Sequence, residues 1–424
     1  MMTGMYSKTV LENGVKILSE RMDHFQSVSL GIWVSVGSRD EVKKENGISH
    51  FIEHMIFKGT EHRSGVQIAK ELDAIGGFSN AFTGKEHTCF YSKALNKDFH
   101  RLTDILSDIF LNSIFDPQDM DRERQVILQE INMMEDAADD HIHVLFNDLF
   151  WRNHPLSMCV LGTDETVSEI GKEAVLDYIS RFYTPNRILL AASGDIDHDA
   201  LVAGFQPVFD PLVSNSEAHL RDSPQINAGV SCHWKDLEQV HICIGGRGPD
   251  LSSDMRFAGA VLNTILGGSM SSRLFQEIRE KRGLAYSVYS FLSAYSDTGL
   301  FGVYAATDPS EVNHTLKVVN AEIEKIRTGE LPETELDAAK EHLIGSVLLG
   351  SESTDAGMMR LAKNEFVFGE YVSHDAIIAE LKKVTVDEVV AVAEETFRND
   401  EVSLVTLGPI KKDDLDLACL QFNK

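Results

Sequence analysis

The sequence predicts an α+β protein built as a tandem of two similar domains, each an antiparallel-rich sheet packed with a layer of helices. A helix–turn–strand pattern, KEAVLDYISRFYTPNRILLAASGDI from Lys172, recurs 214 residues later as VDEVVAVAEETFRNDEVSLVTLGPI from Val386. A Pro-initiated helical pattern recurs too, in FDPQDMDRERQVILQEI from Phe115 and ELPETELDAAKEHLIGSV from Glu330. The apolar strand VSLGIWVSVGS likewise pairs with VHICIGGRG. Because each sheet must bury one face against helices, two copies of this pattern predict two packed domains.

The seam between the two copies lies in the polar stretch PLVSNSEAHLRDSPQINAG, residues 211–229. We therefore expect a first domain over 1–212, a linker over 213–228 and a second domain over 229–424. A chain of 424 residues is also longer than one ordinary hydrophobic core requires.

The composition, with 43% hydrophobic and 25% charged residues, is that of an ordinary soluble globular protein, and no apolar run approaches a membrane span. A net charge of −27 argues against nucleic acid as a partner, because its phosphates would be repelled. The acidity either serves solubility or steers cationic segments. The cysteines are odd in number, scattered and without a CxxC pair, so we expect them to be reduced. The start of the chain shows no targeting pattern, which predicts a cytoplasmic protein without membrane contact.

The segment ISHFIEHMIFKGT, residues 48–60, combines a helical pattern with two histidines four residues apart. At about 100° per residue, the apolar residues of this segment form one stripe, whereas His50, Glu53 and His54 fall on the opposite side. Both imidazoles can then reach one metal ion, with the glutamate beside it. A solvated polar face is the alternative that this spacing leaves open.

A third ligand is expected from the helix that begins with Asp116 as N-cap and Pro117 at its first position. Glu123 and Glu130 lie on its apolar stripe, about 10 Å apart along the axis. Ionised carboxylates on a core-facing surface are costly unless they are paired or bind a cation. Two histidines and one glutamate form a common catalytic zinc shell, so we expect the two helices to meet over one ion. At the repeat offset the second half has Thr264 and Gly268 in place of the histidines, so one Zn²⁺ per chain is expected.

The motif HFIEH, followed after 75 intervening residues by Glu130, resembles the inverted zinc motif HxxEH of the pitrilysin and insulinase family of metallopeptidases. The resemblance covers nearly the whole chain and is strongest to the two-domain subunits akin to mitochondrial processing peptidase and their bacterial relatives. It implies that zinc is bound by His50, His54 and Glu130, that Glu53 is the general base for a zinc-bound water, and that Glu123 orients one of the ligands without binding the ion itself.

The substrate contacts are also implied by the resemblance. The segment GGFSNAFTGKEHTCFYS, residues 76–92, alternates and follows a Gly-Gly turn, so we interpret it as a strand. The resemblance places Asn80 and Ala81 on an edge strand that pairs with the substrate backbone. The helical angle of Phe57 puts it on the polar side of its helix, where it should wall a pocket. The resemblance implies that this pocket takes the residue after the cleaved bond.

In the second half, GGSMSSRLFQEIREKRGLAYSVYS from Gly267 resembles the second signature of the family, in which an Arg and a Tyr contact the substrate. These are Arg279, near the end of a helix closed by Gly283, and Tyr286 in the strand that follows. Because the full-length enzymes of the family enclose substrate between four such domains, two domains suggest a homodimer, with Arg279 and Tyr286 acting within a chain or across the interface.

The sequence therefore predicts a zinc-dependent endopeptidase that hydrolyses extended peptides or unfolded segments. The alternative is a non-catalytic structural or peptide-binding subunit of the same family. A zinc hydrolase acting on a non-peptide bond is a third interpretation, which the substrate strand and the Arg279/Tyr286 pair disfavour.

Overall fold

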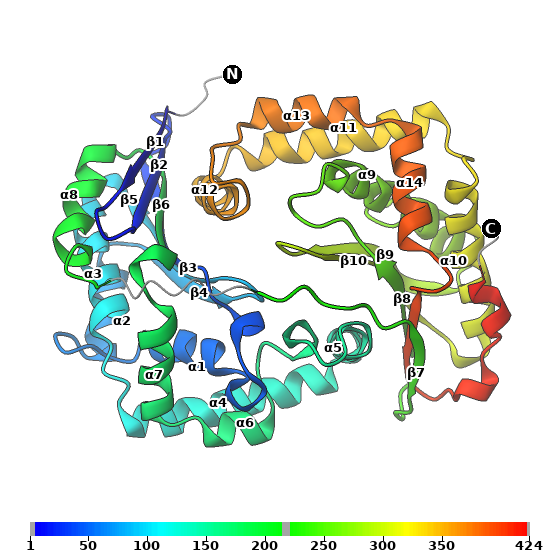
Figure 1. Cartoon of the computed structure of the whole chain (residues 1–424), viewed down its shortest axis with the longest axis horizontal. Coiled ribbons are helices and arrows are strands. Elements are labelled where there is room, and N and C mark those ends of the chain that lie inside the picture. Colours follow the sequence, from blue (N-terminus) through cyan, green and yellow to red (C-terminus); the bar gives the residue numbers. More distant parts are fainter. Residues whose placement is uncertain (1–4, 214–220, 422–424) are drawn as a thin grey trace. The chain divides into compact units, whose positions relative to one another are not determined.

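The computed structural model of the chain describes residues 5–213 and 221–421, apart from the side chains of residues 419 and 420. Residues 214–220 of the predicted linker lie outside the described residues. The chain divides into two compact units, and each is described by itself (Figure 1). Unit 1 combines Met1–Met133, Met158–Arg221 and Leu349–Ser373, and unit 2 combines Met134–Ser157, Asp222–Leu348 and His374–Lys424.

The sheet of unit 1 has six strands in the order β1-β2-β6-β3-β5-β4. The β2–β6 pair is parallel and the other pairs are antiparallel. This order makes β4 an edge strand. The strands are β1 (Met5–Val10), β2 (Lys16–Arg21), β3 (Ser27–Val34), β4 (Phe78–Thr83), β5 (Thr88–Leu95) and β6 (Ile188–Gly194).

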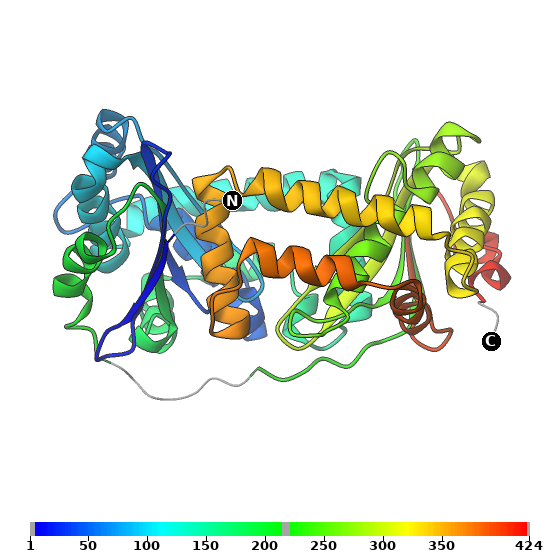
Figure 2. The same cartoon turned by 90° about the horizontal axis from the view of Figure 1, so that it is seen from above.

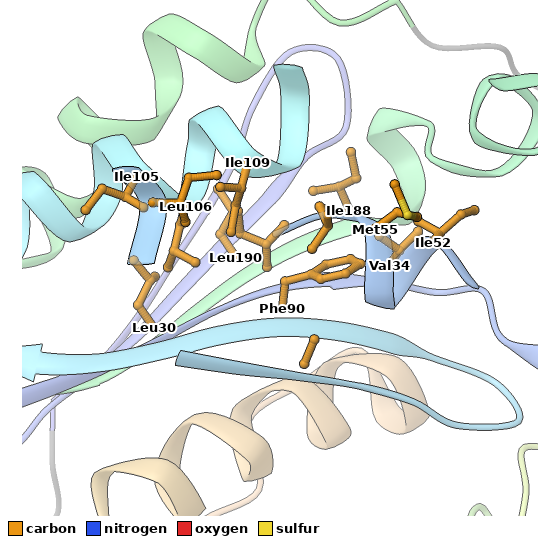
Figure 3. Packing of buried hydrophobic residues seen from close by; sticks show 14 of the residues in the cluster. Leu30, Val34, Ile52, Met55, Phe90, Ile105, Leu106, Ile109, Ile188 and Leu190 are labelled. Carbon is orange, nitrogen blue, oxygen red and sulfur yellow. The ribbon is translucent and has the colours of Figure 1, made fainter. Parts of the chain in front are cut away.

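One face of this sheet packs on helices whose apolar stripes form the larger core of the unit. Figure 3 shows part of that core, in which side chains of α1 and α3 meet strand residues such as Phe90 and Leu190. The helices that contribute to this core are α1 (Ile48–Met55), α2 (Gly65–Ala74), α3 (Phe99–Asn112), α4 (Pro117–Asp136), α6 (Asp164–Glu169), α7 (Lys172–Phe182) and α8 (His198–Phe209).

The sheet of unit 2 has five strands in the order β7-β11-β8-β10-β9, with one parallel pair, β7–β11. Its strands are β7 (Gly229–His233), β8 (Val240–Arg247), β9 (Ala285–Ala294), β10 (Gly299–Thr307) and β11 (Ser403–Leu407). One face packs on a helical layer that comprises α9 (Arg256–Leu266), α10 (Val312–Arg327), α11 (Glu333–Gly350), α13 (His374–Lys383) and α14 (Val386–Thr396). None of the helices within residues 5–213 and 221–421 is both long and apolar enough to cross a bilayer.

The two strand orders correspond position by position, from β2 and β7 to the edge strands β4 and β9. The tandem of two similar α+β domains is therefore confirmed. The repeated segments match as well, since α7 corresponds to α14 and α4 to α11. Each sheet thus presents its edge strand at the same topological position.

A helix from the other half of the sequence covers the second face of each sheet. The helix α12 (Thr354–Phe368) packs against β2, β3 and β6 of unit 1, where Figures 1 and 2 show it in orange beside those strands. In the same way, α5 (Ala138–Phe150) packs against β8 and β11 of unit 2. The boundaries predicted at residues 212 and 229 follow the sequence repeat, whereas the packing units exchange these two helices. A repeat in sequence identifies equivalent segments and does not reveal on which sheet each one packs.

Ion pairs to a buried glutamate and a close approach at a glycine hold α12 on the first sheet. Glu365, whose side chain is 2% exposed, binds the ammonium groups of Lys8 and Lys16, each at 2.7 Å. At Gly357 the helix lies so close to β6 that an added Cβ would collide with the side chain of Ser193, coming within 3.1 Å of its Cβ. Glycine at position 357 is therefore a packing requirement.

We expect Gly357→Ala to lower the free energy of unfolding by about 1–3 kcal/mol, because the added methyl group overpacks the contact between α12 and β6. Gly345→Ala in α11 is the matched control. No atom lies within 4 Å of the Cβ it would add, so it should stabilise the protein by roughly 0.5–1 kcal/mol through helix propensity. Urea titrations of the two variants measure the difference. Equal effects of the two substitutions would contradict the close packing of α12.

Candidate metal centre

The helix α1 is fixed at its first turn by the buried carboxylate of Glu41. The backbone N–H groups of Gly47 and Ser49 donate to its two oxygens at 2.8 and 2.9 Å. A carboxylate at this position satisfies amides that have no partner within the helix and complements the helix dipole. Burial raises the pKa of Glu41 to about 7, and the hydrogen bonds from Ser49 and Gly47 oppose that rise. Gly47, at φ 93°, takes the left-handed conformation from which the helix begins.

Both faces of α1 are shielded from water. The predicted apolar stripe of this helix is confirmed, since it is at most 2% exposed at Ile48, Phe51, Ile52, Met55 and Ile56. On the opposite face His50 is 7% exposed and the side chain of His54 is 17% exposed. The alternative of a solvated polar face is therefore wrong for these two histidines.

The helix α4 faces the histidines with two carboxylates. Its predicted N-cap is confirmed, because the side-chain oxygen of Asp116 accepts the amide of Gln118 at 2.9 Å. Glu123 and Glu130, seven residues or about two helical turns apart, both face α1, as the sequence predicts. Glu130 Oε2 lies 3.7 Å from His50 Nε2 and 3.4 Å from His54 Nε2.

The side chains of His50, His54 and Glu130 form the one group in the described part of the chain whose ligand atoms could hold a metal ion, all within 4.8 Å of one another. Two imidazole nitrogens and one carboxylate are a donor set that suits zinc. Burial, with His54 nearby, lowers the pKa of His50 to about 4, so its imidazole is neutral at physiological pH, as a metal ligand must be. The residues present therefore fit a zinc ion.

Glu53 projects beside this group and is held by a residue that the sequence did not indicate. Its Oε2 accepts a hydrogen bond from Thr83 Oγ1 at 2.6 Å, at the end of the edge strand β4. Burial raises the pKa of Glu53, and the hydrogen bond from Thr83 acts in the opposite direction. No sequence signal identifies Thr83, because the contact joins two elements that are 30 residues apart.

Glu123 lies where a ligand-orienting residue is expected. Its Oε2 is 3.2 Å from His54 Nδ1, and its Oε1 is 2.6 Å from the ammonium of Lys58. A hydrogen bond to Nδ1 leaves Nε2 of His54 free to face Glu130 and an ion. Lys58, like Thr83, was not among the residues that the sequence singled out.

The predicted substrate strand differs in part from the structure. The segment 76–92, interpreted as one strand, contains the hairpin of β4 and β5, because the chain reverses at Gly84, whose amide donates to His87 O at 2.8 Å. Asn80 and Ala81 nevertheless lie on the edge strand β4. Phe57 lines an open pocket of about 850 Å³ together with residues 58–66, which run from the end of α1 into the first turn of α2.

Arg279 and Tyr286 belong to unit 2 and contact each other, with the guanidinium carbon 4.1 Å from the centre of the Tyr286 ring. Arg279 is in the short helix η6 (Phe275–Glu280), Gly283 follows at φ 62°, and Tyr286 is at the start of β9. The predicted local structure is therefore confirmed. Tyr286 is 77% exposed, so its ring is available to a ligand.

Comparisons with known proteins agree over most of the chain. The family model "Insulinase (Peptidase family M16)" matches residues 16–164, and "Peptidase M16 inactive domain" matches residues 169–343. An uncharacterized zinc protease of Bacillus subtilis is 37% identical over 96% of this chain and 98% of its own length. An uncharacterized zinc protease of Streptomyces coelicolor is 39% identical over 96% of this chain and 90% of its own length. The crystal structure of a protease from Helicobacter pylori shares the fold, with a TM-score of 0.89 and 22% identity over 96% of this chain and all of the other.

We expect His50→Ala, His54→Ala and Glu130→Ala each to lose bound zinc, because each removes one of three donors to the ion. Glu53→Gln is the matched control, since it alters a neighbouring carboxylate that is not one of the three proposed ligands and should leave zinc bound. Metal analysis of the dialysed proteins measures the zinc content. Full zinc occupancy in any of the three alanine variants would remove that residue from the ligand set.

Proposed function

Since the chain belongs to the M16 (insulinase) family of peptidases, we propose that it is a zinc-dependent endopeptidase that hydrolyses extended peptides or unfolded segments. The observation that carries this proposal is the convergence of His50, His54 and Glu130 within 4.8 Å, with Glu53 beside them. The zinc-protease names of the relatives support the same metal. The proposed chemistry and the proposed substrate contacts rest on the residues around this site.

The proposed chemistry divides the work between the ion and Glu53. Zinc, when bound, supplies a Lewis acid that polarises the scissile carbonyl and acidifies the attacking water. Glu53 accepts the proton of that water and passes it to the leaving amine. Thr83 holds the Glu53 carboxylate by its 2.6 Å hydrogen bond, so that one oxygen is fixed and the other remains available for the proton. The neutral imidazole of His50 and the Glu123-bound imidazole of His54 serve as ligands.

Substrate binding is proposed to use the free edge of β4. An extended peptide can add to this edge through backbone hydrogen bonds, which give affinity without selecting side chains. Because Thr83 ends the same strand and contacts Glu53, a peptide paired with β4 would run toward the general base. Phe57 is proposed to wall the pocket for the residue after the cleaved bond, and Arg279 with Tyr286 to contact the peptide from unit 2.

The assembly and the location of the protein are further parts of the proposal. We propose a homodimer in which Arg279 and Tyr286 serve the site of one chain or of its partner. A cytoplasmic location stays a prediction.

We predict that Glu53→Gln lowers kcat/KM for a quenched peptide by at least about 100-fold, since an amide cannot accept the proton. Thr83→Val should lower kcat by roughly 10-fold, the effect of one lost hydrogen bond, and Thr83→Ser should keep the wild-type rate because it retains the hydroxyl. Near-normal turnover by the Glu53→Gln protein would contradict the mechanism. A wild-type protein that holds zinc and binds peptide without cleaving it would be the non-catalytic subunit instead.

We also predict that one sequence is cleaved as a flexible peptide and resisted within a stable domain, because an edge strand accepts only a chain whose backbone hydrogen bonds are free. The two substrates are compared at equal concentration by mass spectrometry of the products. The same domain carrying a destabilising core substitution is the control, and its cleavage should rise as it unfolds. Equal rates for the peptide and the stable domain would refute selection by backbone pairing.

A further inference from the structure

We propose that Lys58 is a positioning residue of the metal site, which fixes His54 through Glu123. The inference rests on the proposed zinc site and extends it by one residue. Three contacts lie in series: Lys58 Nζ to Glu123 Oε1 at 2.6 Å, Glu123 Oε2 to His54 Nδ1 at 3.2 Å, and His54 Nε2 to Glu130 Oε2 at 3.4 Å. Each oxygen of Glu123 is therefore engaged by a different partner.

Glu123 needs a cationic partner because the site is rich in carboxylates. Glu53, Glu123 and Glu130 crowd around two imidazoles, and the side chain of Glu123 is 12% exposed. A carboxylate with so little contact with water is stabilised by an ion pair. Lys58 supplies that pair at a short distance, while its own side chain is 38% exposed and stays partly hydrated.

The pair also determines the direction in which Glu123 points. Without Lys58, the carboxylate could turn away from His54 Nδ1 or toward the ion itself. With Oε1 bound to Lys58, Oε2 stays on Nδ1 and keeps the proton on that nitrogen, so that Nε2 presents its lone pair to the metal. Lys58 lies in the turn three residues after the end of α1, and its amide donates to Met55 O at 3.0 Å, so the turn that closes the ligand-bearing helix carries the lysine that orients the ligand.

The two ligand histidines differ in this respect. His54 has a partner on Nδ1, whereas Nδ1 of His50 is buried without a hydrogen-bond partner. Packing in the core-like surroundings of α1 fixes His50, which is 7% exposed. Loss of Lys58 should therefore act through His54 alone.

The direction in which zinc affinity changes when Lys58 is replaced distinguishes a positioning role from a purely electrostatic one. Removing a positive charge near a dication should by itself tighten zinc binding. If Lys58 positions Glu123, Lys58→Met should instead weaken zinc binding, by roughly 10-fold as expected for an outer partner of a ligand. Lys58→Arg, which keeps the cation and can bind the same carboxylate, should restore most of the affinity.

The experiment measures zinc dissociation constants by chelator competition for the wild-type protein, Lys58→Met, Lys58→Arg, Glu123→Gln and the Lys58→Met, Glu123→Gln double variant. Thermal unfolding of the zinc-free proteins is followed in parallel. Lys70→Met is the matched control, because Lys70 is an exposed lysine of α2 in the same unit. We expect Lys58→Met to add nothing to Glu123→Gln, since both act on His54 by one route.

Unchanged or tighter zinc binding in Lys58→Met would overturn the proposal. Additive losses in the double variant would also overturn it, because they would mean that Lys58 acts independently of Glu123. A failure of the zinc site itself would appear differently, as wild-type zinc affinity in His54→Ala.

Discussion

The structure around the candidate metal centre depends on the confinement of charged and polar groups between α1 and α4. His50 and His54 of α1 face Glu123 and Glu130 of α4, and among these four side chains only that of Glu130, at 39%, is more than one fifth exposed. Such groups cost free energy unless each has a partner of opposite charge or a metal ion. The site has therefore been built with both faces of α1 covered, its apolar stripe by the sheet of unit 1 and its polar face by α4. Glu41 at the start of the helix and Lys58 after its end hold it at both termini.

Unit 2 has the same architecture without side chains that could bind a metal at the equivalent helix. Its sheet has the corresponding strand order, and α9 stands in place of α1. At the position that matches His50, Thr264 is buried and donates to Ala260 O at 3.0 Å within its own helix. The helix ends at Leu266, before Gly268, which occupies the position of His54 and packs against the backbone of Asn263. The equivalent surface is thus closed by backbone and a hydroxyl, and it presents no ligand pair.

The sequence predicts the local features of the site well. Helical periodicity places the apolar stripe of α1, Asp116 marks the start of α4, and Gly283 marks the turn before Tyr286, because each of these depends on neighbours within one or two turns of the chain. The contacts of Thr83 with Glu53 and of Lys58 with Glu123 were not predictable, since they join elements 30 and 65 residues apart in sequence. The exchange of α5 and α12 between the sheets has the same cause: amphipathic helices fit either sheet, and their sequences do not identify the partner. The hairpin at Gly84 was missed because alternation continues on both sides of the turn.

We infer that unit 1 binds one zinc ion on His50, His54 and Glu130. The most direct measurement is X-ray diffraction from crystals of the zinc-loaded protein on either side of the zinc absorption edge, which locates the metal without reference to activity. We expect one anomalous peak per chain, about 2.0–2.2 Å from Nε2 of both histidines and from a carboxylate oxygen of Glu130. A zinc peak elsewhere in the chain, or none near α1 in a fully loaded protein, would contradict this zinc site.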